Sequence, residues 1–341
     1  MRTVIGIDGD RFTRNGEWTH AGRTFRGTDI SGLLFNSRMV NAIVDDRNQA
    51  TRGVWAYPDG PWDPARNSFE FGAALPAYHR HGLDAVTINM QGGSPQGYSW
   101  NQPWNFSGFA ADGTPLSDTL GRLDHVLEAA DAADMAVILG VFYGAAARRL
   151  VGEAAVIRAL DATVAHLMAG GWRNVMLEIG NEVDNRAFTH EAIQPARCAE
   201  LITRVREASW GRLKVSTSFN GGVVPPDHII GVSDFVLLHG NNVEDPARIA
   251  ELVAEVRASP GYRGQPILFN EDDHCGFEDD DNNMLAAIKS RAGWGYFDYR
   301  RIREGFADGY QSLPVDWGIR SARKRGFFRL LAEVTGNKEP E

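Results

Sequence analysis

Eight short apolar segments, separated by helix-like segments, constrain the fold of this chain more than any other feature of its sequence. Each apolar segment is rich in Val, Ile, Leu or Phe, and its hydrophobicity is continuous rather than alternating. Continuous hydrophobicity is typical of strands that are buried on both faces, as in a parallel sheet. The predicted strands cover residues 30–36, 83–90, 135–142, 174–180, 213–219, 234–240, 266–271 and 292–298.

The segments between these strands carry the pattern of amphipathic helices. In 117–134 and in 153–169, apolar residues recur at spacings of three and four, which places them on one face of a helix. Asp245 and Pro246 supply an N-cap and a first-turn proline for a further helix. Other helices are predicted over 69–81, 190–209, 279–291 and 320–335, and the segment after the fifth strand holds at most a short turn.

Eight buried strands interleaved with about eight helices predict an α/β protein with a (β/α)₈ TIM barrel. The alternative is an open doubly wound sheet, which usually carries a glycine-rich phosphate loop after its first strand. The corresponding segment of this chain, SRMVNAIVDD, contains no glycine. We expect one domain over 1–341, with an N-terminal β-hairpin in 1–26 that turns at Asn15-Gly16. The βα loops after strands one and two are long.

Composition excludes several classes of function. With 44 acidic and 35 basic residues the formal charge is −9, which argues against a nucleic-acid partner because phosphate binding needs clustered Lys and Arg. No apolar run approaches the roughly 18 residues of a membrane span, and no signal-peptide pattern is seen. We therefore expect no membrane partner and a cytoplasmic location, or a secreted or periplasmic one if an export signal was removed. The oligomeric state stays open.

Polar residues gather at the C-terminal ends of the predicted strands, where barrels carry their function. Glu182 ends strand four in LEIGNE, and Glu271 ends strand seven in ILFNE. Strands four and seven lie three positions apart in the ring, so the two glutamates should face each other across the mouth of the barrel. Two carboxylates that flank a bond are what glycoside cleavage requires. One such glutamate alone is as easily a helix cap or a surface residue, so the hypothesis of glycoside cleavage rests on the two glutamates together.

These motifs, together with the leading hairpin, His239 after strand six and Trp294 on strand eight, resemble the clan A glycoside hydrolases. The nearest group is the family 5-like enzymes of the cellulase and mannanase type, and the resemblance covers most of the chain. It implies a retaining double displacement on a β-linked glycan or glycoside, with Glu182 as acid/base and Glu271 as nucleophile. Their carboxyl groups would lie about 5–5.5 Å apart. The resemblance also implies that Trp294 forms the floor of the sugar subsite, and no cofactor or metal is expected.

Three positions depart from the family pattern. Strand two carries no Arg near the nucleophile, and Arg38 after strand one is the expected substitute. Phe142-Tyr143 stands where the family usually has a His near strand three, and no Tyr follows His239. The two glutamates remain, but the subfamily, the sugar, its linkage and endo or exo action stay open.

Further residues at the strand ends and in the long loops are expected to bind substrate. Asn181 can donate a hydrogen bond to a sugar hydroxyl, and Arg38 or His239 can support an ionised Glu271. Tryptophans in the loops after strands one and two offer flat apolar faces on which sugar rings stack. The full expected set is Asn181, Arg38, His239, Asn241, Trp294, Asn89, Tyr143, Trp55, Trp100 and Trp104.

Two other functions stay open at this point. A non-catalytic carbohydrate-binding barrel would use the same carboxylates only to hold sugar, and it would bind glycan without turnover. A metal-dependent barrel hydrolase would use the acidic segment 271–281, although this segment matches neither a calcium loop nor a zinc-binding spacing. A chelator would abolish the activity of such a hydrolase.

Overall fold

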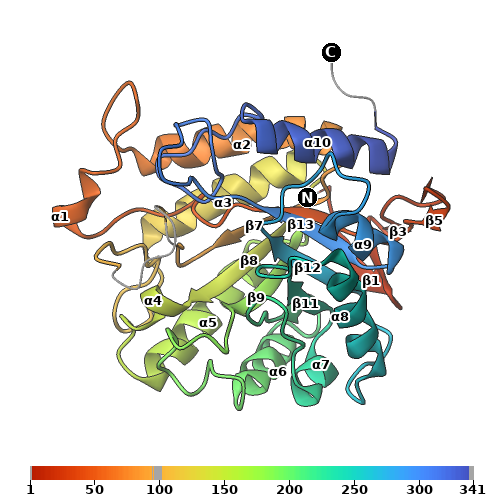
Figure 1. Ribbon diagram of the computed structural model, residues 1–341. Coiled ribbons are helices and arrows are strands. Elements are labelled where there is room, and N and C mark those ends of the chain that lie inside the picture. Colours follow the sequence, from red (N-terminus) through yellow and green to blue (C-terminus); the bar gives the residue numbers. More distant parts are fainter. Residues whose placement is uncertain (1, 94, 96–101, 338–341) are drawn as a thin grey trace.

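A computed structural model describes residues 2–93, 95 and 102–337 of the chain (Figure 1). Its centre is an eight-stranded sheet with the strand order β10-β9-β8-β7-β6-β13-β12-β11, in which all paired strands are parallel. Each predicted strand overlaps one of these eight. Their bounds are β6 (Phe35–Arg38), β7 (Ala85–Asn89), β8 (Ala136–Tyr143), β9 (Val175–Asn181), β10 (Lys214–Ser216), β11 (Val236–His239), β12 (Ile267–Asp272) and β13 (Gly293–Phe297).

The ring closes between β10 and β11 through individual backbone hydrogen bonds. The amide nitrogen of Asp234 donates to the carbonyl oxygen of Val215 at 2.9 Å, and that of Gly222 donates to the carbonyl oxygen of His239 at 3.0 Å. With the parallel ladders of the other strands, these bonds complete an eight-stranded barrel with helices around it. The predicted (β/α)₈ fold is confirmed.

The helices lie outside the barrel, and none in the described part of the chain is long and apolar enough to cross a membrane. Predicted and observed helices differ mainly at their first residues. Asp63 caps α2, accepting hydrogen bonds from the amides of residues 65 and 66, so this helix begins before the predicted residue 69. The helix bounds are α1 (Gln49–Arg52), α2 (Pro64–Arg80), α3 (Ser117–Ala132), α4 (Gly144–Ala147), α5 (Glu153–Ala169), α6 (Cys198–Ala208), α7 (Asp227–Val232), α8 (Pro246–Ala258), α9 (Asn283–Lys289) and α10 (Ala322–Thr335).

The N-terminal segment forms a three-stranded antiparallel sheet instead of a single hairpin. The predicted turn at Asn15 and Gly16 is present between the second and third strands, with φ angles of 55° and 87°. A second turn, in which Gly9 has a φ of 58°, joins the first two strands. The strands are β1 (Ile5–Asp8), β2 (Arg11–Arg14) and β3 (Glu17–Trp18), and a two-stranded sheet of β4 (Thr24–Phe25) and β5 (Thr28–Asp29) follows.

The sheet of β1–β3 covers the N-terminal end of the barrel, on the side away from α1 and α4 (Figure 1). Ile5 and Phe12 of this sheet are buried with apolar residues from the barrel strands, namely Leu34, Ala85, Ala136, Ile138, Met176, Phe235, Leu237 and Leu268. Further along the strands the buried side chains become polar. The amide of Asn36 donates to Thr87 Oγ1 and to the carbonyl oxygen of Asn270, both at 3.1 Å. The apolar end is therefore closed, and the polar groups lie toward the C-terminal strand ends.

Candidate active site

Two glutamates stand at the C-terminal ends of β9 and β12. Glu271 lies within β12 and its side chain is 3% exposed, whereas Glu182 directly follows β9 and its side chain is 16% exposed. A carboxylate oxygen of each and a ring nitrogen of His239 all lie within 4.8 Å of one another. The fold thus brings together the two glutamates and the histidine that the sequence pattern singles out.

Glu271 is held from both sides of its carboxylate. Arg38 Nε forms an ion pair with Oε2 at 2.5 Å, and Asn241 Nδ2 donates a hydrogen bond to Oε1 at 2.7 Å. His239 Nδ1 lies 3.8 Å from Oε2. A guanidinium and an amide donor therefore fix the position of this buried carboxylate and balance its charge.

Glu182 has fewer partners and a more open position. Its Oε1 lies 3.0 Å from His239 Nδ1, and its backbone nitrogen donates to Ser218 Oγ at 3.0 Å. Its φ angle is +56°, in the left-handed region that residues other than glycine rarely occupy. Such a conformation is held by its surroundings, and it is commonest at functional sites.

His239 is fully buried between the two glutamates. Burial opposes the charged imidazole, but the carboxylate of Glu271 and the hydrogen bond and charge of Glu182 outweigh this effect and raise the pKa of His239 above its usual value. The imidazole therefore takes up a proton more readily between these two acidic side chains than a free histidine does.

Arg38 is the expected replacement for the missing strand-two arginine, and its guanidinium is fully buried at the mouth. Besides Glu271, it contacts Glu178 Oε2 through one terminal nitrogen at 3.2 Å and Asn181 Oδ1 through the other at 2.6 Å. Burial disfavours its charge, but the carboxylates of Glu178 and Glu271 prevail and raise the pKa of Arg38. The guanidinium stays charged.

Glu178 was not among the predicted site residues. It is the one charged side chain within the apolar run of β9, and it is fully buried. A fully buried glutamate is rare unless it is paired. A glutamate within an apolar strand therefore indicates a buried charged partner, and the sequence prediction overlooked this.

Asn89 and Tyr143 lie at the C-terminal ends of neighbouring strands, β7 and β8. Asn89 is fully buried against Gly140, and its amide has no hydrogen-bond partner among the residues that the structure describes. The ring of Tyr143 packs beside Gly93, and its backbone nitrogen donates to Gln91 Oε1 at 3.1 Å. Tyr143 pairs in register with Asn181, the residue before Glu182, whereas Asn89 lies one strand further round the barrel.

Trp294 does not occupy the expected place. On β13 the glycines at 293 and 295 face the interior, since a side chain there would meet Leu268 and Asn36. Successive side chains of a strand alternate, so Trp294 points outward, where its ring packs against Phe327 of α10 and is fully buried. Its Nε1 donates to Asp272 Oδ2 at 3.0 Å. This placement does not fit a subsite floor, because no face of the ring is free for a sugar.

The loop tryptophans mostly pack against one another. Trp55 is 1% exposed, donates from Nε1 to Asp46 Oδ2 at 2.8 Å, and meets the ring of Trp104 edge-on at 5.7 Å between centroids. This burial does not fit the expected contact of Trp55 with substrate. Trp104 is partly exposed. Trp100 lies outside the described residues.

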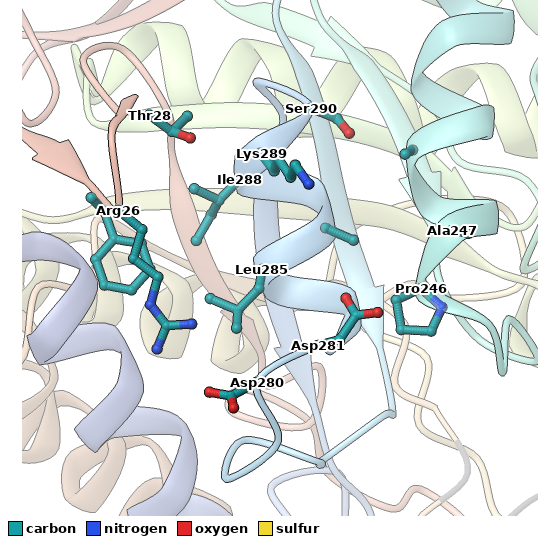
Figure 2. Close-up of a pocket in the computed structure, with 13 residues that line it drawn as sticks. Arg26, Thr28, Pro246, Ala247, Asp280, Asp281, Leu285, Ile288, Lys289 and Ser290 are labelled. Atoms are coloured by element: carbon teal, nitrogen blue, oxygen red, sulfur yellow. The ribbon is translucent and has the colours of Figure 1, made fainter.

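The acidic segment 271–281 has two separate roles in the structure. Both carboxylate oxygens of Asp272 accept from protein donors: His274 on Oδ1, and Trp294 and Asn283 on Oδ2. Asp280 and Asp281 lie elsewhere, beside a surface groove of about 790 Å³ between α8, α9 and the β4–β5 turn (Figure 2). Within the segment, one ligand atom each of Asp272, Asp273 and His274 lies within 4.8 Å of the others, whereas Asp280 and Asp281 do not belong to this group.

No protein-family model and no curated protein sequence matches the chain. Solved structures match its fold. An endo-1,4-β-mannanase from Rhizomucor miehei aligns at 12% identity with a TM-score of 0.59, over 98% of this chain and 100% of its own. A GH5-4 broad-specificity endoglucanase from Bacteroides salanitronis aligns at 14% identity with a TM-score of 0.56, over 89% of this chain and 93% of its own.

A glycoside hydrolase family 5 protein from Bacteroides vulgatus aligns at 13% identity with a TM-score of 0.56; the match covers 91% of this chain but 66% of that one. The chain has the fold of the family 5 glycoside hydrolases. Within this fold, Glu182, Glu271 and His239 stand together as the resemblance implies. Trp294 departs from it, and a shared fold leaves the substrate undecided.

Proposed function

We propose that this protein is a retaining glycoside hydrolase that cleaves a β-linked glycan or glycoside by double displacement. The observation that carries the proposal is the approach of oxygens of Glu182 and Glu271 to within 4.8 Å. Retaining enzymes hold their two carboxyl groups about 5–5.5 Å apart, whereas inverting enzymes leave about 6.5–9.5 Å for a water molecule. The short separation supports direct attack of a carboxylate on the sugar.

The surroundings of the two glutamates support different roles. Glu271, buried and paired with Arg38, acts as the nucleophile because its carboxylate is held as an anion in a fixed place. Glu182 is more exposed and has no arginine partner among the described residues, so it acts as the acid/base that exchanges protons with the leaving group and water. The ring nitrogen Nδ1 of His239 lies 3.0 Å from Glu182 Oε1 and 3.8 Å from Glu271 Oε2, so it bridges the two carboxylates.

The reaction proceeds in two steps. Glu271 attacks the anomeric carbon while Glu182 protonates the departing oxygen, which leaves a glycosyl ester on Glu271. Glu182 then removes a proton from water, and the water attacks the same carbon and frees Glu271. The chemistry uses no cofactor.

Amide side chains at the strand ends are the proposed substrate contacts. Arg38 engages the amide oxygen of Asn181, which leaves its amide nitrogen for a sugar hydroxyl. Asn241 and Asn89 have buried amide atoms without a partner among the described residues, so a hydroxyl can pair with them. Trp104 adds a partly exposed ring from the loop, and the buried ring of Tyr143 lies at the end of β8.

A screen over aryl β-glycosides and β-linked polysaccharides tests this function. On the active sugar, the matching 2,4-dinitrophenyl 2-deoxy-2-fluoro glycoside should attach to the protein, and mass spectrometry should locate the adduct on Glu271. Glu271→Gln should form no adduct, and Glu182→Gln should release the aryl group of activated glycosides faster when azide replaces water as the attacking group and forms a glycosyl azide. Full turnover in both variants would overturn the proposal.

The same screen separates the other two functions. A binding protein would retain glycan in calorimetry without releasing product, and Glu271→Gln would still bind. A metal-dependent hydrolase would lose turnover in EDTA, whereas the proposed mechanism predicts equal rates with and without chelator.

A further inference from the structure

A third glutamate lies beneath the two at the mouth. Glu178 is on β9, four residues before Glu182, and its side chain is fully buried. Its Oε2 lies 3.2 Å from a terminal nitrogen of Arg38, and its Oε1 accepts from Ser218 Oγ at 2.6 Å and from Asn270 Nδ2 at 3.4 Å. Donors from three other parts of the barrel therefore converge on this one carboxylate.

Through two of these partners, Glu178 is linked to both proposed catalytic glutamates. The guanidinium of Arg38 that it holds also pairs with Glu271, at 2.5 Å from Oε2. The hydroxyl of Ser218 that donates to it also accepts the backbone nitrogen of Glu182 at 3.0 Å. Each catalytic side chain is thus one group away from Glu178.

The link through Arg38 affects the charge of the site. The guanidinium is shared between two buried carboxylates, so each receives part of its stabilisation. An arginine that faced Glu271 alone would hold it more firmly as an anion and make it a weaker nucleophile toward the sugar, because attack removes that negative charge.

The link through Ser218 affects the geometry of the site. Glu182 adopts a positive φ angle of 56°, which must be held by neighbouring groups. The hydroxyl of Ser218 accepts from Glu182 with its own hydrogen turned away, and Glu178 at 2.6 Å is a nearer acceptor for that hydrogen than the carbonyl oxygen of Gly180 at 3.5 Å. The carboxylate therefore orients the hydroxyl that holds the turn.

We propose that Glu178 is a positioning residue for the double displacement: it moderates the charge that Arg38 applies to Glu271 and anchors the turn that presents Glu182. This inference rests on the proposed function. Other titratable groups that face the cluster are His239 from β11, Tyr143 from β8 and Asp273 after β12.

The test is Glu178→Gln, which keeps the size of the side chain and removes its charge. We expect kcat to fall about 10- to 100-fold, as for supporting residues of other sites, with KM nearly unchanged. The acidic limb of the pH–rate profile should move about one pH unit lower, because Arg38 then acts on Glu271 alone. Glu178→Asp keeps the charge and should recover part of kcat and the original acidic limb.

Asp84→Asn is the matched control, since Asp84 is also a buried carboxylate in ion pairs. It pairs with His20 at 2.8 Å and Arg14 at 3.4 Å at the opposite end of the barrel. This variant should lose stability but keep the pH profile of the parent protein. If Glu178→Gln behaves in the same way, Glu178 is merely structural and the inference is wrong.

A measurement without substrate separates this inference from the proposed function. In ¹³C spectra of protein labelled at the glutamate carboxyls, the Glu271 signal is assigned by its loss in Glu271→Gln. Its pH-dependent change in chemical shift should be displaced to lower pH in Glu178→Gln relative to the parent. An unmoved signal overturns the inference even if the parent is an active hydrolase, and a moved signal supports it even if no glycan is cleaved.

Ser218→Ala keeps the inference testable if Glu178→Gln does not fold. It breaks the link to Glu182 and leaves the pairing of Glu178 with Arg38 intact. We expect a lower kcat with an unmoved acidic limb, and an unchanged kcat would overturn the anchoring role.

Discussion

Replacing Arg38 by methionine should both destabilise the protein and change the pH dependence of its reaction. The guanidinium is fully buried and has three acceptors: Glu271 at 2.5 Å, Glu178 at 3.2 Å and Asn181 at 2.6 Å. Methionine fills much of the same volume but leaves two buried carboxylates without their guanidinium partner and the amide oxygen of Asn181 without its arginine donor. The perturbation is therefore electrostatic rather than a loss of packing.

The size of the effect follows from these contacts. Two unit charges about 4 Å apart attract by about 4 kcal/mol at an effective dielectric constant of about 20. Removing one partner of a buried ion pair costs about 3–5 kcal/mol, because the other charge is left buried and unpaired. We expect the free energy of unfolding at pH 7 to fall by about 3–5 kcal/mol in Arg38→Met.

The loss should depend on pH in a defined direction. Without Arg38, the buried carboxylates keep protons in the folded state that the unfolded chain releases above about pH 4. The folded variant then binds more protons than its unfolded state, so its stability falls as pH rises. The gap between parent and variant should be smaller at pH 5 than at pH 7.

Urea unfolding followed by tryptophan fluorescence at both pH values measures this gap. Arg38→Lys is the conservative comparison, since it keeps a charge but cannot reach three acceptors at once. The free energy of unfolding of Arg38→Lys should lie between those of the parent and of Arg38→Met. A loss below about 1 kcal/mol at pH 7 in Arg38→Met, the worth of an exposed pair, would refute the buried ion network. In activity assays the acidic limb should move upward, opposite to its movement in Glu178→Gln.

Three further predictions address other parts of the molecule. Phe12→Ala should lower the free energy of unfolding by about 3–5 kcal/mol in urea titrations without changing kcat, because Phe12 is buried at the end of the barrel opposite the site. The hydrogen bond that the His274 ring donates to Asp272 raises the pKa of His274 to about 9, so the stabilisation that the charged ring provides is complete below about pH 6.5 and is lost as pH rises through 9. The difference in Tm between the parent and His274→Gln should accordingly be largest near pH 6 and vanish near pH 10, and a constant difference would contradict this. Trp294→Phe should lose about 1–3 kcal/mol of stability with its hydrogen bond to Asp272, and KM should stay within about twofold. A large rise in KM would show that Trp294 contacts sugar after all.

Much of the fold could be predicted because burial on both faces leaves a continuous apolar run in each barrel strand. The first and last residues of the helices were harder to predict, since they depend on single capping or proline residues. Asp63-Pro64 is the same cap as Asp245-Pro246, but the polar first turn that follows it hid the start of α2. In the segment 190–197, Pro195 lacks a backbone donor, and α6 begins only at residue 198.

The two glutamates could be predicted as a pair because two strands of the ring end in Asn-Glu, whereas either glutamate alone is as easily a helix cap or a surface residue. The orientation of Trp294 could not be predicted from the sequence pattern of its strand. The alternation in GWGYF places Trp294 and Tyr296 on one face of β13 and the glycines on the other, but the strand alone does not say which face meets the interior. The packing of Phe327 from α10 against the aromatic face decides it. Interior glycines also make room for Asn36 of the neighbouring strand.

The burial of Trp294 and Trp55 changes how this site would recognise sugar. Because protein contacts occupy these two rings, we expect amides to be the main sugar-binding groups among the described residues at the strand ends. A buried amide without a partner costs about 1–3 kcal/mol, and the cost is recovered when a ligand hydroxyl supplies the missing hydrogen bond. Asn89 and Asn241 carry such atoms. Hydrogen bonding rejects a sugar that lacks the matching hydroxyl far more strongly than stacking does, so discrimination should depend on hydroxyl orientation.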